Sequence, residues 1–313
     1  MYYVAHRLFA AHDRALAACL ADRLAAKVGA GNVFLPFCDT DEEDLVAEVK
    51  GRRLFELDSE RLRRLTAMIA ILHGPSLDDG VCMEVGYASA LGTPVIVVTT
   101  DFQTYSLTEA GPQLAFPDPL VECLASRVVR GERLGHPPPP PAASRFEVFA
   151  HRNREQVERA VKETVDAALS VTPQRTAGLS VSVRTPRTSF VEPSPYGSEA
   201  AAIGAVLARA GYTTRTATRL RAAAPMAAAR ADWAAALASE LLLADVSGPE
   251  TPPGAAVLIG AATALGRQVV AYQQWPVFTH AHGREPNWRN LMIQYASGTH
   301  ITSAKDLATW IGA

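Results

Sequence analysis

Residues 77–88, Leu-Asp-Asp-Gly-Val-Cys-Met-Glu-Val-Gly-Tyr-Ala, place two carboxylates, Asp78 and Glu84, on either side of a glycine turn that leads into an apolar helix. We expect Glu84 about one turn into that helix, partly desolvated and close to the positive helix end. A carboxylate held in this way suits a nucleophile, or an electrostatic partner for a developing sugar cation. The stretch alone is equally compatible with a capped surface helix that leaves Glu84 in solvent.

Four apolar segments around this stretch are predicted strands, at residues 2–9, 32–37, 67–72 and 93–99. They alternate with predicted helices over residues 13–26, 58–65 and the region after Gly80. Such alternation indicates a parallel sheet wound on both faces. Ligands of these sheets bind at the carboxyl ends of the strands, which is where Asp58 and the two carboxylates of residues 77–88 fall.

Residues 1–105 resemble, in order, the nucleoside 2-deoxyribosyltransferase family. The aromatic residue and loop after the first strand correspond to Tyr3 and to Ala5-His6-Arg7-Leu8-Phe9. The aspartate before the third strand corresponds to Asp58. The family signature is matched at Asp78, Gly80, Glu84, Gly86, Tyr87 and Ala88, and the following turn at Gly92-Thr93-Pro94-Val95.

The resemblance implies a role for each matched residue. Glu84 would attack C1′ of a nucleoside and form a glycosyl ester, Asp58 would help to move the proton of the leaving base, and Asp78 would hold sugar hydroxyls. Tyr3 would donate a hydrogen bond to the nucleophile. The remaining residues expected to bind substrate in this half are Phe9, Gly80 and Tyr87.

The second half of the chain repeats the first with a shift of 174 residues. The shift takes Asp58 to Asp232 and Gly86 to Gly260, which predicts a pseudo-dimer of two flavodoxin-like or Rossmann-like α/β domains, at residues 1–172 and 179–313. It also takes Glu84 to Leu258, so the second copy should be catalytically dead. Asp232 would then be a helix cap.

A dead second copy could still complete the first site. The family takes an Asn-Leu-Met-like segment from a neighbouring subunit to reach the sugar, and this chain carries that pattern at Asn290-Leu291-Met292, in the second half. Asn290 and Met292 are therefore expected to bind substrate. The alternative is that Asn290 only caps the helix that runs to Tyr295.

The linker between the copies is expected in two places. Five prolines at residues 137–141 predict a stiff polyproline spacer, and residues 172–178 are the expected domain junction. Between them, valines at four-residue spacing predict a long amphipathic helix over residues 146–169. An alanine-rich helix is expected within residues 222–236.

Composition favours an ordinary cytoplasmic enzyme. The net charge of −2 and the absence of an 18-residue apolar run argue against a nucleic-acid partner and against a membrane span. The four cysteines show neither metal nor redox spacing. Neither His280 with His282 nor the acidic residues 39–44 predict a metal site, so we expect no metal and no cofactor.

Three functions remain open at this point. The first is a transferase that exchanges bases between 2′-deoxyribonucleosides, with nucleosides and free nucleobases as its partners. The second is an N-glycoside hydrolase of a nucleoside or of a nucleoside 5′-monophosphate, although the loop after the first strand lacks the serine expected for phosphate binding. The third is a non-catalytic nucleotide-binding module, against which the retained Asp58, Asp78 and Glu84 argue. The pseudo-dimer could pair again into a homodimer.

Overall fold

The computed structural model describes residues 1–40, 50–132, 144–174, 187–280 and 286–312. The proline run at 137–141, the acidic residues 41–44, most of the expected junction at 172–178, and His282 lie outside these ranges.

The first half of the chain forms a five-stranded parallel sheet with the order β2-β1-β3-β4-β5. Both faces of this sheet are covered, which explains why β3 and β4 are apolar and buried along their whole length. Its strands are β1 (Tyr2–Ala5), β2 (Val33–Phe34), β3 (Ala67–Ile71), β4 (Val95–Thr99) and β5 (Arg127–Arg130).

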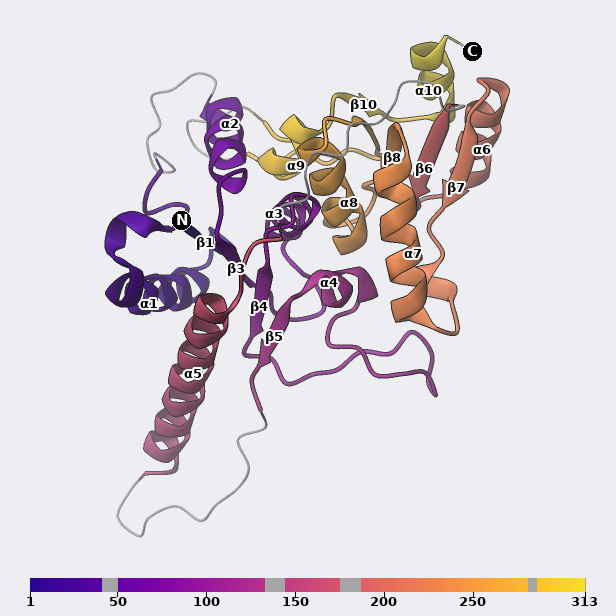
Figure 1. Ribbon diagram of the computed structural model, residues 1–313. Coiled ribbons are helices and arrows are strands. Elements are labelled where there is room, and N and C mark those ends of the chain that lie inside the picture. The colour runs from indigo at the N-terminus through magenta and orange to yellow at the C-terminus, as the bar shows by residue number, and fades with distance from the viewer. Residues whose placement is uncertain (41–49, 133–143, 175–186, 281–285, 313) are drawn as a thin grey trace.

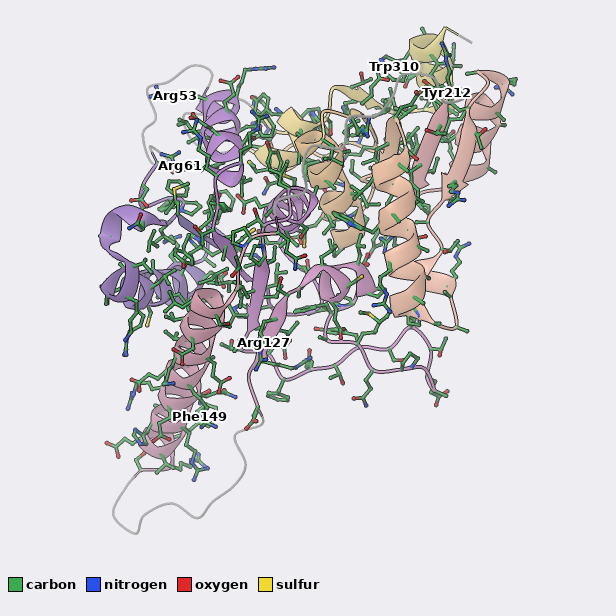
Figure 2. All side chains as sticks on the ribbon, viewed as in Figure 1. Arg53, Arg61, Arg127, Phe149, Tyr212 and Trp310 are labelled. Carbon is green, nitrogen blue, oxygen red and sulfur yellow. The ribbon has the colours of Figure 1, made fainter. Side chains whose placement is uncertain are left out.

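Helices α1 (Ala11–Val28) and α5 (Arg145–Ser170) pack on one face of this sheet. Helices α2 (Lys50–Leu62), α3 (Asp79–Ala90) and α4 (Pro119–Leu124) pack on the other. Helix α5 begins with a capping box formed by Ser144 and Glu147. Its first turns extend beyond the sheet, and Phe149 on this part is exposed (Figures 1 and 2).

The second half forms another five-stranded parallel sheet, with the order β10-β9-β8-β6-β7. Read from β7, this is the same order as in the first sheet, and the prediction of two doubly wound α/β domains is confirmed. The strands are β6 (Thr188–Glu192), β7 (Thr213–Thr216), β8 (Leu241–Asp245), β9 (Gln268–Tyr272) and β10 (Thr299–Ile301). The helices are α6 (Ala200–Arg209), α7 (Pro225–Ala238), α8 (Pro253–Ala264), α9 (Leu291–Ala296) and α10 (Ala304–Ile311).

Helices α3 and α8 cross between the two sheets and join them through one continuous core (Figure 1). The crossing is self-complementary. A Cβ atom built on Gly86 would lie 1.8 Å from the carbonyl oxygen of Val257, and one on Gly260 would lie 1.9 Å from that of Met83. Because 83 and 86 become 257 and 260 under the shift of 174, each helix makes the same contact with the other, as in a two-fold symmetric dimer.

Two element boundaries differ from the sequence prediction. Strand β2 ends at Phe34, and not at residue 37, because Pro36 has no N–H to donate and Phe37 adopts a left-handed φ of 68°. Asp58 does not open a helix. It lies inside α2, which begins at Lys50.

The expected helix over 146–169 is confirmed as α5, and the alanine-rich helix as α7. Among the helices of the described residues, none is both long and apolar enough to cross a membrane.

Candidate active site

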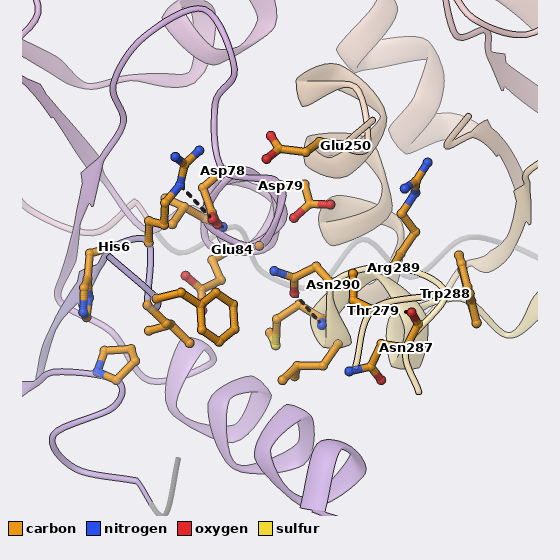
Figure 3. Close-up of a pocket in the computed structure, with 18 of the residues that line it drawn as sticks. His6, Asp78, Asp79, Glu84, Glu250, Thr279, Asn287, Trp288, Arg289 and Asn290 are labelled. Atoms are coloured by element: carbon orange, nitrogen blue, oxygen red, sulfur yellow. Dashed lines mark hydrogen bonds and ion pairs between the residues drawn. The ribbon is translucent and has the colours of Figure 1, made fainter. Parts of the chain in front are cut away.

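A cavity of about 560 Å³ lies between the carboxyl ends of the first sheet and the second domain (Figure 3). Its first-domain wall comes from the loop after β1, from α2 and from the start of α3. Its second-domain wall comes from the loops before α8 and α9. The lining includes seven predicted site residues: Phe9, Asp58, Asp78, Gly80, Glu84, Asn290 and Met292.

The start of α3 positions the two carboxylates of the signature stretch. Asp78 is the N-cap of the helix, and its Oδ1 accepts a hydrogen bond from the backbone N–H of Val81 at 2.9 Å. Glu84 follows on the cavity side of the helix and is 6 % exposed. The interpretation in which Glu84 lies on a solvated surface helix is therefore wrong.

Glu84 is oriented from behind by a tyrosine. The hydroxyl of Tyr3, on β1, donates to Glu84 Oε1 at 2.5 Å, and the Tyr3 ring is fully buried. Such a charge-assisted hydrogen bond favours one carboxylate rotamer and leaves Oε2 as the oxygen that the tyrosine does not bind. A fixed carboxylate at the wall of a concave pocket is well placed to attack an electrophilic carbon.

Asn290 caps a helix, as the alternative from the sequence predicted, and it also lines the cavity. As the N-cap of α9, its Oδ1 accepts from the backbone N–H of Met292 at 2.9 Å. Its amide nitrogen meanwhile faces the first domain, so closely that a Cβ atom on Gly80 would lie 2.7 Å from Nδ2 (Figure 3). The glycine thus makes room for the asparagine of the other domain, and the capping bond leaves the NH₂ group directed at the cavity.

Asp58 reaches the cavity from α2 and is 4 % exposed, whereas Phe9 lies at the rim and is 71 % exposed. Tyr87 was expected to bind substrate, but the structure places it away from the cavity. Its ring is fully buried, and its hydroxyl accepts a hydrogen bond from Arg63 Nε at 2.8 Å. The hydrogen bond from Arg63, which directly follows α2, holds the Tyr87 side chain on the α2 side of α3 and outside the cavity lining.

Two further acidic residues, Asp79 and Glu250, lie on the wall beside Asp78 and were not predicted. Burial, reinforced by Asp78, raises the pKa of Asp79 to about 7. Burial likewise raises the pKa of Asp78, with Arg7 opposing the shift. Asp79 Oδ2 accepts from the backbone N–H of Thr251 at 3.4 Å. Glu250 accepts a hydrogen bond from the hydroxyl of Ser76.

These two acids belong to the contact between the domains as well as to the cavity. Ser76 and Glu250 are 174 residues apart, so they are equivalent positions of the two halves. Asp79 could have been found from the sequence, because it directly follows the predicted Asp78. Glu250 could not, because the pairing of equivalent loops depends on how the domains dock.

Two arginines also line the cavity, and the structure gives each a partner. Arg7 lies 3.6 Å from Asp78 and donates to the carbonyl of Ser76. Arg289 donates to the carbonyls of Val246 and Gly248, at 2.6 Å each, and so ties the loop before α9 to the end of β8. Within the described ranges, no group of three or more His, Cys, Asp or Glu side chains could hold a metal ion.

Asp232 does not cap a helix, contrary to the sequence prediction. It lies inside α7, and its carboxylate accepts from the backbone N–H groups of Thr218 and Arg219. The carboxylate thereby holds the turn that precedes α7, a contact between segments that helix-capping rules do not describe.

Comparison with known proteins finds a family match over the domain that carries these carboxylates. Residues 2–136 match a family model described as nucleoside 2-deoxyribosyltransferase. No curated protein matches the chain. The matched range spans β1 to β5 and contains Tyr3, Asp58, Asp78 and Glu84. The first domain of the chain is therefore similar, over residues 2–136, to the nucleoside 2-deoxyribosyltransferase family.

Proposed function

We propose that this protein cleaves the N-glycosidic bond of a nucleoside through a covalent glycosyl-Glu84 intermediate and transfers the sugar to another base. The observation that carries the proposal is the Tyr3–Glu84 hydrogen bond at the wall of a cavity that both domains line. In the first step Glu84 attacks C1′ and the C1′–N bond breaks. In the second step a nitrogen of the incoming base attacks C1′ and releases the carboxylate.

Two other acids have the remaining roles, proton transfer and binding of the sugar. Asp58, on the α2 wall, handles the proton of the departing or incoming base. Asp78 accepts hydrogen bonds from sugar hydroxyls, since its Oδ1 is already fixed by the backbone N–H of Val81. Tyr3 keeps the attacking carboxylate in one orientation and gives up part of its hydrogen bond as the ester forms.

The second domain is, in this proposal, a degenerate copy of the first that has lost its own chemistry. It carries Leu258 at the position equivalent to Glu84 and Pro252 at that of Asp78. Its contribution is the other wall of the active site, where Asn290 offers an NH₂ group to the sugar and Met292 offers apolar contact. The fused chain would thereby supply from within what a separate subunit supplies elsewhere in the family.

The charge of the wall favours a neutral nucleoside over a nucleoside 5′-monophosphate. Five carboxylates line the described part of the cavity: Asp58, Asp78, Asp79, Glu84 and Glu250. Of the two arginines there, Arg7 pairs with Asp78 and Arg289 is held by backbone carbonyls. A phosphate dianion would meet net negative charge at this wall.

The proposal is tested by incubating the protein with 2′-deoxyinosine, with and without cytosine or adenine, and separating the products by chromatography. A new deoxynucleoside that forms only with the acceptor base supports the transferase. Hypoxanthine released regardless of acceptor identifies a hydrolase of the same mechanism. No reaction with deoxynucleosides, ribonucleosides or their monophosphates would overturn the catalytic proposal.

The matched variant for this experiment is Glu84→Ala. It should abolish turnover and leave the circular dichroism spectrum unchanged, because the side chain is a wall residue of the cavity and not a part of the apolar core. Turnover near the wild-type rate in this variant would refute the assignment of the nucleophile.

A further inference from the structure

The α3/α8 crossing has two equivalent ends. At the open end, the N-cap of α9, Asn290, reaches across to Gly80. At the closed end, the N-cap of α4, Asp118, reaches across to Gly254, where a Cβ atom would lie 2.4 Å from Asp118 Oδ2. Gly80 and Gly254 are 174 residues apart. Asp118 is thus the first-domain counterpart of Asn290, and the closed end stands where the second domain would have its own active site.

A buried arginine fills the closed end. The guanidinium of Arg219 is 1 % exposed and binds Asp118 in a bidentate pair, with Nε–Oδ1 at 2.7 Å and Nη2–Oδ2 at 2.8 Å. It binds Glu192, at the end of β6, in a second pair of 2.8 and 2.7 Å. Asp232 Oδ2 lies 3.5 Å from Nη1 and also accepts from the Arg219 backbone N–H. Three carboxylates and one guanidinium therefore share a water-excluded site.

Only one of these three carboxylates comes from the first domain. Glu192 and Asp232 hold Arg219 within the second domain, whereas Asp118 extends the cluster across the contact between the domains. A bidentate arginine–carboxylate pair fixes distance and angle together. The Arg219–Asp118 pair thus determines how α4 sits on the second domain, and α4 packs beside α3 in the same core.

We propose that Arg219, through Asp118, is a positioning residue for the open end: it fixes the α3/α8 crossing and so holds Asn290 beside Gly80. The former second site has become a structural ion cluster that serves the remaining one. This inference rests on the proposed function, because it takes Asn290 to be a sugar-binding residue. Arg219 itself touches neither the cavity wall nor the reacting atoms.

The test compares Asp118→Asn with Glu192→Gln. Each removes one charge from the partners of Arg219 and keeps the shape of the side chain, but only the first weakens the link between the domains. Asp118→Asn also retains the oxygen that caps α4. We expect Asp118→Asn to raise KM for the nucleoside about tenfold, the size of a typical coupling between contacting residues. In Glu192→Gln, KM and kcat should stay as in the wild type.

The effect of Asp118→Asn should disappear in an Asn290→Ala background, because the link acts through Asn290. An unchanged KM in Asp118→Asn, an equal rise in Glu192→Gln, or a full additional rise in the Asn290→Ala background would each overturn the proposal. A cluster that serves stability alone would lower the unfolding temperature of both variants alike and leave KM unchanged in both.

Amide hydrogen exchange separates this inference from the proposed function. Asp118→Asn should exchange faster than Glu192→Gln along α3 and α8, whether or not the protein turns over a nucleoside. If the wild-type chain is inactive, the proposed function fails, and the hydrogen exchange rates of α3 and α8 alone test the link between the domains. Equal protection of α3 and α8 in the two variants would then overturn the proposal.

Discussion

The open and closed ends of the α3/α8 crossing share one backbone plan and differ in a few side chains. In the first sheet Tyr3 pairs with Met68, and in the second Phe190 pairs with Leu242 at the same register. The hydrogen-bonded Tyr3–Glu84 pair therefore has Phe190 and Leu258 as its apolar counterparts.

The two ends also differ in how their carboxylates are compensated, because one end is filled and the other holds a cavity. At the closed end the guanidinium of Arg219 fills the site and compensates the carboxylates of Asp118, Glu192 and Asp232. At the open end a cavity of about 560 Å³ remains beside the acids. Under the proposed function, the second site became structural because Arg219 fills it and because Phe190 and Leu258 replace the hydrogen-bonded pair.

The largest effect is expected from Glu84→Leu, which gives the open end the residue found at the closed end. We expect turnover to fall by on the order of 10⁴-fold or more, because the proposed nucleophile is lost. The double variant Tyr3→Phe/Glu84→Leu reproduces the apolar pair and should unfold at or above the wild-type temperature, since no buried hydroxyl is left without an acceptor. Steady-state rates and thermal unfolding check both, and a double variant less stable than Glu84→Leu would contradict the equivalence of the pairs.

The crossing itself is tested by Gly86→Ala and by its counterpart Gly260→Ala. Each new Cβ would lie within 2 Å of a backbone carbonyl oxygen of the other helix, at 1.8 and 1.9 Å. Each variant should lose about 3 kcal/mol of unfolding free energy, because neither helix can move without disturbing the core. Urea denaturation measures the loss.

The control for these variants is Gly204→Ala in α6, where nothing lies within 4 Å of the new Cβ. It should stabilise the protein by up to about 1 kcal/mol, as alanine does in a helix interior. Similar stabilities of Gly86→Ala and Gly204→Ala would show that the domains do not dock through α3 and α8.

A pair of variants separates the capping role of Asn290 from its proposed role in binding the sugar. Asn290→Ala removes both the cap and the NH₂ group, and should lower kcat/KM by about 10- to 100-fold and stability by about 1 kcal/mol. Asn290→Asp keeps the cap and gives the open end the residue of the closed end. It should retain stability yet lose at least as much kcat/KM, because a carboxylate cannot donate to the sugar and faces other acids. Full activity in Asn290→Asp would contradict the proposed role of the Asn290 NH₂ group in binding the sugar.

The last effect concerns pH. The pKa of Asp79 is raised from 3.8 to about 7, with burial as the main cause, so the contribution of its protonated form to stability is fully present below about pH 4 and is lost as the pH rises through 7. Asp79→Asn should therefore be more stable than the wild type at pH 8 and no more stable at pH 4. Thermal unfolding across this range gives the answer, with the exposed Asp22→Asn as the control that should follow the wild-type profile. A constant difference between Asp79→Asn and the wild type at every pH would show that the buried charge has no part in it.

The fold and three acids of the first-domain wall, Asp58, Asp78 and Glu84, could be predicted from the sequence because each leaves a local pattern. Alternating apolar segments predicted the strands β3 and β4, and the order of Asp78, Gly80 and Glu84 around a helix start placed both carboxylates at the carboxyl end of a strand. The repeat at 174 residues predicted the second sheet, and with it the loss of a carboxylate at Leu258.

What only the tertiary structure decided depends on the contact between the two halves. Asp118 is an ordinary helix cap in the sequence, and Arg219 is an ordinary arginine in a polar turn. Their bidentate pair forms only because Gly254 leaves room where α8 meets the first domain. Asn290 is likewise compatible with a mere cap until Gly80 is seen beside its NH₂ group. Local patterns follow the backbone of one segment, whereas these contacts join residues 101 to 210 positions apart, and the docking of two sheets through two glycines determines them.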